Sequence, residues 1–148
     1  MARSWEAAGS VRLPGGKPVV GPYVGRIIES VAERLIPDGG DLPVMVGDTG
    51  AYPFLAGYLR DQEPGARLAL KALFVIFDLA PPLFIGRLAR FVSLTSQEQD
   101  LYLTDWAASR IYYRRMVLVL LKTLTGMGYY NDPQVLEHLG FSFPCGAR

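Results

Sequence analysis

The sequence is poor in the residues that build most catalytic and metal centres. Among its 148 residues it has one histidine, His138, and one cysteine, Cys145. A single cysteine cannot form an internal disulfide, so no disulfide framework indicates the redox compartment. Zinc sites require several Cys or His ligands, and the di-iron sites of helical bundles require two Glu-x-x-His pairs. This chain alone can supply neither, and we predict that it contains no catalytic, cofactor-binding or metal-binding residue.

A charge excess and a long hydrophobic run are also missing. The net charge is +1, which is too balanced to predict a nucleic-acid-binding surface. The longest apolar stretches, such as residues 116–121, fall far short of the roughly 18 residues needed to cross a membrane. Residues 1–20 contain neither the apolar core of a signal peptide nor a twin-arginine pair. We therefore predict no transmembrane segment and a cytoplasmic location, or a periplasmic one only if a partner carries the chain there.

What the sequence has in abundance is hydrophobicity at helical spacing. Half of its residues are hydrophobic, and no segment alternates with the period of two that is typical of a strand. The spacing predicts helices at 22–36, 53–62, 64–79, 95–124 and 133–139, and a shorter amphipathic piece at 83–92. Residues 1–21 are rich in glycine and proline, and they predict an extended arm that is loose or bound along a partner. The predicted fold is an all-α, single-domain bundle of five to seven helices at 22–148, preceded by this N-terminal arm.

Two of the predicted helices carry more specific expectations. The helix at 64–79 is apolar nearly all round, so we expect it to be buried on most sides. The helix at 95–124 begins with a capping box formed by Thr95 and Glu98, and we expect it to run unbroken until glycines loosen its end. Its expected buried stripe comprises Leu101, Trp106, Ile111, Val117, Leu118, Leu121 and Leu124.

The sequence SRIYYRR contains the densest cluster of charge in the chain. Arg110 and Arg114 lie one turn apart on the same predicted helix face, with Tyr113 beside them. Two interpretations are open. In the first, Arg110 or Arg114 forms an ion pair with Asp78 or Asp105 of the same chain. In the second, Arg110, Tyr113 and Arg114 anchor a partner, because Arg and Tyr are typical hot-spot residues of interfaces.

The sequence GMGYYNDP indicates that the long helix breaks and that a short helix restarts. Asp132 can cap the new helix, which has a proline at its first position and a glycine after its end. Tyr129 and Tyr130 either close the end of the bundle or form an aromatic docking surface. Phe141 and Phe143 follow in an apolar tail that a monomer has little reason to expose. We therefore predict that Tyr129, Tyr130, Asp132, Phe141 and Phe143 bind a partner.

The segment YLTDWAASRIYYRRMVLVLLKTLTGMGYYNDPQVLEHLGF, residues 102–141, resembles the C-terminal signature of the gluconate 2-dehydrogenase subunit 3 family. In that family a Ser-Arg helix leads into Leu-Lys, a Tyr-Tyr or Phe-Tyr pair, Asp-Pro, and a short helix ending in Gly-Tyr or Gly-Phe. LIPDGG, the proline-headed helix at 53 and LTSQEQDLYL also fit, so the resemblance covers most of residues 23–141. The matching residues are Ser109, Arg110, Leu121, Lys122, Thr123, Tyr129, Tyr130, Asp132, Pro133 and Gly140.

The resemblance implies a small helical subunit that accompanies a large flavoprotein of the glucose-methanol-choline oxidoreductase type. In such a complex the partner holds FAD and oxidises a sugar or an alcohol, while the small subunit binds and stabilises the partner or helps it to fold. None of the matching residues is catalytic in that family. The resemblance thus predicts a non-catalytic subunit of a hetero-oligomer, with FAD in the partner and no cofactor in this chain.

Two alternatives from other classes stay open. A stand-alone helical enzyme or ligand-binding protein would enclose an apolar pocket around Phe74, Phe77 and Trp106. A transient assembly chaperone or a self-associating structural protein would need an exposed surface but no flavin. The isolated chain distinguishes these hypotheses, because a subunit aggregates without its flavoprotein, a carrier is a well-behaved monomer, and a structural protein forms homo-oligomers.

Overall fold

The computed structural model describes residues 11–141, and in this range it contains seven α-helices and two short 3-10 helices. They are α2 (Pro22–Leu35), η1 (Val46–Asp48), α3 (Ala51–Asp61), α4 (Pro64–Leu79), α5 (Pro81–Phe84), η2 (Phe91–Ser93), α6 (Ser96–Ala107), α7 (Tyr112–Tyr130) and α8 (Pro133–His138). The described residues form no β-strand, and their only β-type pairing is one bridge between Arg12 and Pro18. The predicted all-α class and the predicted number of helices are confirmed.

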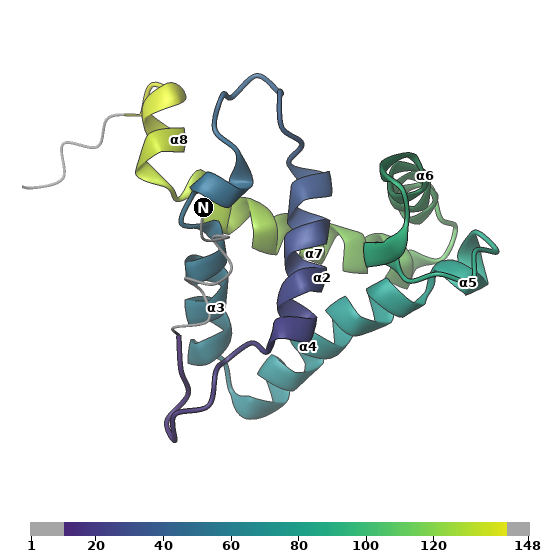
Figure 1. The fold of residues 1–148 in the computed structure, drawn as a ribbon, viewed down its shortest axis with the longest axis horizontal. Coiled ribbons are helices and arrows are strands. Elements are labelled where there is room, and N and C mark those ends of the chain that lie inside the picture. Colours follow the sequence, from purple (N-terminus) through teal and green to yellow (C-terminus); the bar gives the residue numbers. More distant parts are fainter. Residues whose placement is uncertain (1–10, 142–148) are drawn as a thin grey trace, which may run out of the picture.

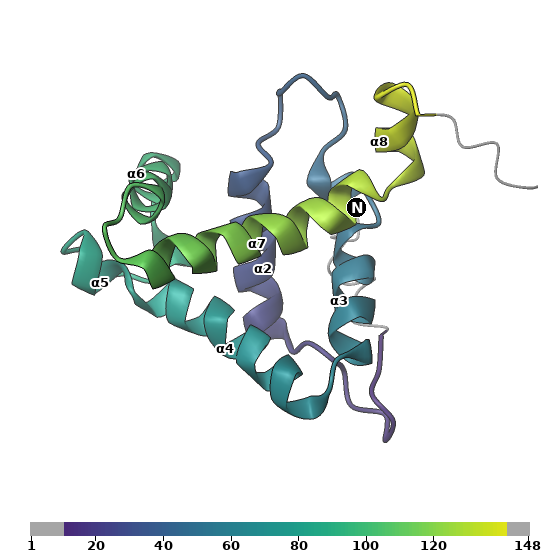
Figure 2. The ribbon, with the colours of Figure 1, turned by 180° about the vertical axis from the view of Figure 1, so that it is seen from behind.

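The helices are arranged around α2. In Figure 1, α2 stands at the centre of the view, with α3 on one side and α4 running diagonally past its lower end. The long helix α7 crosses behind α2 and contacts α3, α6 and α2. Seen from behind in Figure 2, α7 and α4 both lie in front of α2 and diverge from the α5–α6 end toward α3. The surfaces of α7 and α4 that face away from α2 therefore form one side of the fold.

Local sequence signals explain most of the helix starts. Helices α2, α4, α5 and α8 each have a proline in the first turn, where its fixed φ suits the helix and its missing N–H is not needed. The predicted capping box of α6 is present, because the amide of Glu98 donates to Thr95 Oγ1 and the amide of Thr95 donates to Glu98 Oε2. These two bonds satisfy amides that the first helical turn leaves without partners.

The predicted unbroken helix at 95–124 is wrong. Helix α6 ends at Ala107, and α7 begins at Tyr112 after a new N-cap, Ile111. The reason is a polar side chain in the intervening turn: Ser109 Oγ accepts a hydrogen bond from the Ile111 amide at 3.1 Å. Serine competes with helical hydrogen bonding in this way, so the chain turns where the hydrophobic spacing alone would continue.

The predicted helix break at GMGYY is also wrong, because α7 continues through both glycines to Tyr130. The expected buried stripe changes accordingly. Leu118, Leu121 and Leu124 are buried, whereas Leu101 and Ile111 are mostly exposed. Two separate helices each have their own orientation toward the core, so a stripe drawn along one continuous helix does not describe both.

The expectation that the helix at 64–79 is buried on most sides is wrong as well. In α4 only Phe74, Phe77 and Asp78 are buried, and Leu68 and Ile76 have more than half of their surface exposed. Phe77 lies in an aromatic cluster, with ring-centroid distances of 5.0 Å to Phe91, 5.0 Å to Tyr102 and 4.9 Å to Trp106. The residues proposed for an apolar ligand pocket thus pack against other side chains of the core.

The arm predicted at 1–21 is described from residue 11 onward. Val19 and Val20 are buried in the core of this chain, and the Val19 amide donates to the carbonyl of Val11 at 3.1 Å. This part of the arm is therefore anchored to the helical domain. The predicted partner residue Phe143, like Cys145, lies outside the described residues.

Candidate functional site

Helix α7 carries hydrophobic residues on two opposite faces. The inner face includes Leu118, Leu121, Leu124 and Tyr129, which are buried. The outer face includes five large side chains whose exposed fractions lie between 44% and 58%: Tyr112, Met116, Val119, Met127 and Tyr130. Because an α-helix turns by about 100° per residue, these five fall within about 60° of a single line, opposite the buried face. We call this set the outer stripe, and it is about 27 Å long at 1.5 Å per residue.

The inner face is held against α3 by an unusually close approach. A Cβ atom added to Gly128 would lie 2.8 Å from the carbonyl oxygen of Ala51 and 3.0 Å from its Cα atom. The absence of a side chain at Gly128 therefore lets the two backbones touch. One residue later, the Tyr129 hydroxyl donates to the carbonyl of Val44 at 2.7 Å, and burial raises the pKa of that hydroxyl. These contacts fix the rotation of α7 and so direct the outer stripe away from the core.

The charges of α7 are all positive. The helix contains Arg114, Arg115 and Lys122 and no carboxylate. Arg114 forms an ion pair with Asp105. Arg115 and Lys122 form no ion pair with any residue that the structure describes, and their spacing of seven residues places both along one edge of the outer stripe. The outer stripe is thus an apolar surface with a basic edge.

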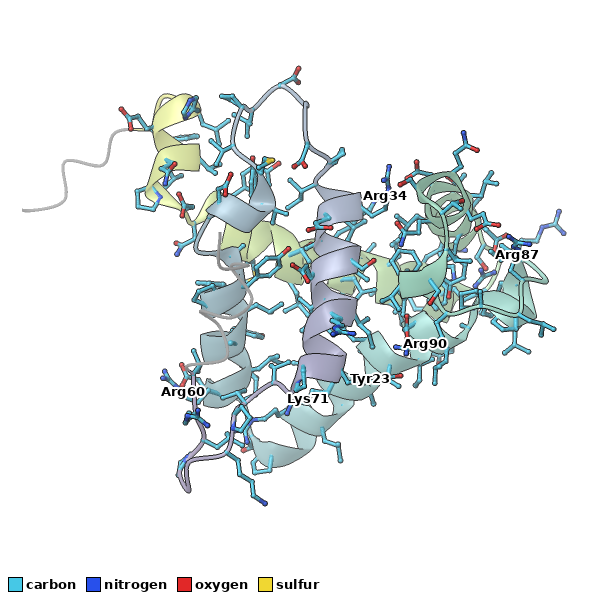
Figure 3. The ribbon with its side chains drawn as sticks, viewed as in Figure 1. Tyr23, Arg34, Arg60, Lys71, Arg87 and Arg90 are labelled. Atoms are coloured by element: carbon cyan, nitrogen blue, oxygen red, sulfur yellow. The ribbon has the colours of Figure 1, made fainter. Side chains whose placement is uncertain are left out.

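The outer side of α2 is different in character. It borders an open groove of about 640 Å³ that is lined mainly by polar and charged residues, among them Arg26, Glu29, Glu33 and Arg90. Figure 3 shows Arg90 next to Tyr23 at the start of α2, and its guanidinium carbon lies 4.6 Å from the Tyr23 ring centroid. The carboxylates of α2 therefore lie along a polar groove, whereas α7 presents hydrophobic and basic groups.

The predicted partner anchor Arg114 has an intramolecular role. Its guanidinium carbon lies 3.7 Å from the ring centroid of Phe84 and 5.0 Å from that of Trp106, and it pairs with Asp105. Only 12% of the side chain is exposed. The intrachain interpretation is therefore confirmed for Arg114 and Asp105, and the arginine joins α5, α6 and α7.

Arg110 and Tyr113, the other two predicted partner residues of the SRIYYRR cluster, do not take part in this intrachain contact. Arg110 and Tyr113 are both exposed, so their predicted role in partner binding stays a prediction. Asp78, the second acidic residue considered for an ion pair, is fully buried and pairs with Arg90. It also accepts a hydrogen bond from the Val92 amide at 3.0 Å, which anchors the segment between α5 and α6 to α4.

At the other end of α7, the predicted partner residues divide into two groups. Tyr129 is 2% exposed and holds α7 against the loop before η1. Asp132 caps α8 through the Gln134 amide at 2.9 Å and also accepts the Gly50 amide at the start of α3 at 2.8 Å. Tyr130 and Phe141 are exposed, and Tyr130 packs edge-on against Tyr129 with a centroid distance of 5.2 Å. Tyr129 and Asp132 therefore position this end, and Tyr130 and Phe141 lie on its surface.

Tyr130 also borders an apolar groove next to the outer stripe. The groove has a volume of about 360 Å³ and is lined by Leu35, Ile36, Pro37, Gly40, Asp41, Leu42, Tyr129, Tyr130 and Leu139. It lies between the end of α2, the following loop and α8. Tyr130 belongs both to the outer stripe and to the lining of this groove, so the groove adjoins the stripe at the end of α7.

The outer stripe connects the two predicted clusters. Arg110 and Tyr113 lie at the first end of α7 and Tyr130 at the last, so the predicted residues alone form two separate spots about 27 Å apart. The sequence analysis missed Met116, Val119 and Met127, which lie between them. With Tyr112 and Tyr130, these residues are spaced by three, four and seven to eight positions, which is typical of one face of a helix. The prediction of a single buried stripe along one long helix left out this second hydrophobic face.

Several residues that carry the family resemblance have structural roles. Leu121 is in the core, Asp132 caps α8, and Ser109 holds the turn before α7. Gly140 follows α8 with a φ of +77°, a conformation that favours glycine after a helix end. These residues therefore contribute to the shape of the α6–α8 region of this chain.

The described residues show neither a metal centre nor a membrane span. Within residues 11–141, no three or more His, Cys, Asp or Glu side chains lie together as a metal site. No helix in the same range combines the length and the hydrophobicity needed to cross a bilayer. Over the described residues, fold and surface define an all-α protein with an exposed apolar face on α7. Comparison with protein-family models, with curated proteins and with solved structures finds no match.

Proposed function

We propose that this chain is a non-catalytic small subunit that binds and stabilises, or helps to fold, a large FAD-dependent sugar or alcohol dehydrogenase of the glucose-methanol-choline type. The observation that carries the proposal of a binding role is the outer stripe. Scattered apolar residues are normal on a protein surface, whereas five large ones aligned along one helix form a patch comparable in size with the largest patches of ordinary monomers, which often have a functional role. The type of partner is taken from the resemblance of residues 102–141.

A binding role also explains how a subunit without chemistry can matter for a dehydrogenase. A subunit that binds only the folded form of its partner stabilises that form by mass action, by about 2.7 kcal/mol when its concentration is one hundred times the dissociation constant. The same contact covers the outer stripe of this chain. FAD and the oxidation of the substrate belong to the partner in this proposal, and the complex is cytoplasmic unless the partner directs its export.

A transient assembly chaperone is the alternative that the same surface supports. It would use the outer stripe on an immature client and leave when the client has folded. The two functions differ in the lifetime of the complex: a subunit stays with the mature, FAD-loaded enzyme, and a chaperone does not.

The test compares the tagged full-length chain purified from its source cells with the same chain expressed alone. We expect the first preparation to contain a flavoprotein in fixed ratio, with a yellow flavin spectrum and dehydrogenase activity on a sugar or an alcohol. We expect the second to aggregate and to be rescued by co-expression of that flavoprotein. A chain that is monodisperse alone and retains no flavoprotein from its source cells would refute the proposal.

A further inference from the structure

The outer stripe has the composition of an interface centre. Its two ends are tyrosines, Tyr112 and Tyr130. At an interface a tyrosine can bury its large rigid ring while its hydroxyl forms a hydrogen bond at the rim. Between them lie Met116, Val119 and Met127, and methionine side chains adapt readily to the shape of a partner. All five are exposed although α7 is the longest helix of the described fold.

The geometry points to one occupant: we propose that the outer stripe binds in an apolar groove on the surface of the partner protein. The rim of that groove carries carboxylates opposite Arg115 and Lys122. The inference rests on the proposed function for the identity of the partner, and it adds the surface and the chemistry of the contact. Charge complementarity is the reason for the carboxylates. Arg115 and Lys122 border the stripe without an ion pair from the described residues, and the Arg115 guanidinium donates a hydrogen bond to the Ser109 carbonyl. Carboxylates on the partner would therefore complement both cations.

The same charges argue against a second copy of this chain. A symmetric pair places the same patch on both molecules, with its axis near the middle of the contact. Lys122 lies near the middle of α7, so it would approach its own copy, and α7 has no carboxylate to separate them. Like charges in direct contact destabilise such a pairing.

An anionic membrane surface fits less well than a protein. A helix that lies on a membrane carries many cations on its polar face, and each adds about 1 kcal/mol near an anionic surface. Here the face opposite the stripe is packed against α2 and α3, and only Arg115 and Lys122 remain beside the stripe. The two cations thus contribute about 2 kcal/mol, and they are fewer than the clusters of about four to eight Lys or Arg that are typical of segments binding anionic lipid.

The size of the stripe predicts how the contact extends. A strip about 27 Å long and about 10 Å wide covers roughly 300 Å², compared with about 800 Å² per partner in a typical stable interface. The partner must therefore reach beyond the stripe. The groove beside Tyr130 is the neighbouring apolar site, and the exposed Leu68 and Ile76 of α4 lie on a helix of the same side of the fold (Figure 2).

The test uses the full-length chain and the FAD-containing protein that copurifies with it. Val119→Asp places a charge at the centre of the stripe, where the side chain is 54% exposed and its replacement should not unfold the domain. Leu101→Asp is the matched control, because Leu101 is 66% exposed in the middle of α6. Met116→Gln is a second, milder variant that retains helix propensity and side-chain length. Circular dichroism verifies that each variant is folded.

We expect Val119→Asp to weaken binding of the FAD-containing protein by about tenfold or more, which is a typical hot-spot effect, and Leu101→Asp to leave binding unchanged. We expect Met116→Gln to weaken binding by a smaller factor. Equal retention by the wild type, Val119→Asp and Met116→Gln would overturn the inference and leave the proposed function intact. Equal loss in Val119→Asp and Leu101→Asp would also overturn it, because the effect would not be specific to the stripe.

The carboxylate rim is tested by Lys122→Glu against Lys17→Glu, which reverses an exposed charge far from α7 in the sequence. We expect Lys122→Glu to slow association and to reduce the salt dependence of binding, and Lys17→Glu to do neither. Identical affinities and salt dependences in the two variants would overturn this part. If no FAD-containing protein copurifies with the wild type, the proposed function fails. In that case, a dimer in gel filtration or binding to phosphatidylglycerol vesicles that Val119→Asp abolishes would overturn the choice of occupant.

Discussion

Gly126 and Gly128 lie two residues apart in α7, yet an added methyl group meets very different surroundings at the two positions. At Gly128 it would lie 2.8 Å from the carbonyl oxygen of Ala51, closer than real Cβ contacts allow. At Gly126 it would meet only two ring carbons of Tyr130, at 3.8 Å and 3.9 Å, which is ordinary van der Waals contact. Gly126→Ala and Gly128→Ala are therefore a matched pair with opposite expected effects.

The magnitudes follow from two opposing contributions. Replacing glycine by alanine inside a helix stabilises by about 1 kcal/mol through helix propensity, and this gain applies at both positions. Overpacking costs about 1–3 kcal/mol, and the upper part of that range applies at Gly128 because the obstacle is the backbone of α3, which no rotamer change removes. We expect Gly126→Ala to raise the free energy of unfolding by up to about 1 kcal/mol and Gly128→Ala to lower it by about 1–2 kcal/mol.

Urea unfolding followed by circular dichroism of the dilute full-length chain measures the difference. At about 2–4 °C per kcal/mol for a chain of this size, the two variants should also differ by about 5–10 °C in Tm. If Gly128→Ala is as stable as Gly126→Ala, then α3 and α7 do not approach as closely as described, and the rotation of α7 that exposes the outer stripe loses its support.

Three further predictions concern the stability of the fold. Asp132→Ala should lower the free energy of unfolding by about 1–2 kcal/mol, because the carboxylate accepts amides from both α8 and the start of α3; an unchanged urea midpoint would contradict this. Arg114→Ala should destabilise by about 1–3 kcal/mol and Arg114→Met by less, since methionine retains the aromatic packing and loses the pair with Asp105 and the hydrogen bond to Ser109; equal losses would show that packing contributes nothing. Burial raises the pKa of Tyr52 and of Tyr102 above the ordinary value of about 10, so their contribution to stability is complete below about pH 10 and is lost as the pH rises further. Alkaline titration of tyrosinate absorbance should therefore show a fraction that ionises only together with unfolding, and a single early transition would refute this.

Short-range chemistry in the sequence predicted much of the fold. Prolines in the first turn mark the starts of α2, α4 and α8, and Thr95 with Glu98 marks the start of α6. Asp132 was predicted as a cap from its position before a proline, and it is one. Such signals act within one helical turn, so they can be read without knowledge of the rest of the chain.

The ends of helices were harder to predict where a side chain competes with the helix. Ser109 interrupts a segment whose hydrophobic spacing favours continuation, and Gly128 does not interrupt one where glycine suggests an end. In the first case a hydroxyl offers the backbone another hydrogen bond. In the second the packing of α7 on α3 makes the missing side chain an advantage.

Residue types settle the helical class and those helix starts that a first-turn proline or a capping box marks, because periodicity and capping are properties of neighbouring residues. They do not settle which hydrophobic face of a helix is covered. Leu118 and Val119 are adjacent and similarly apolar, yet Leu118 is buried and Val119 is 54% exposed. That difference arises from the placement of α2, α3 and α6 against one side of α7, which depends on contacts between distant parts of the chain.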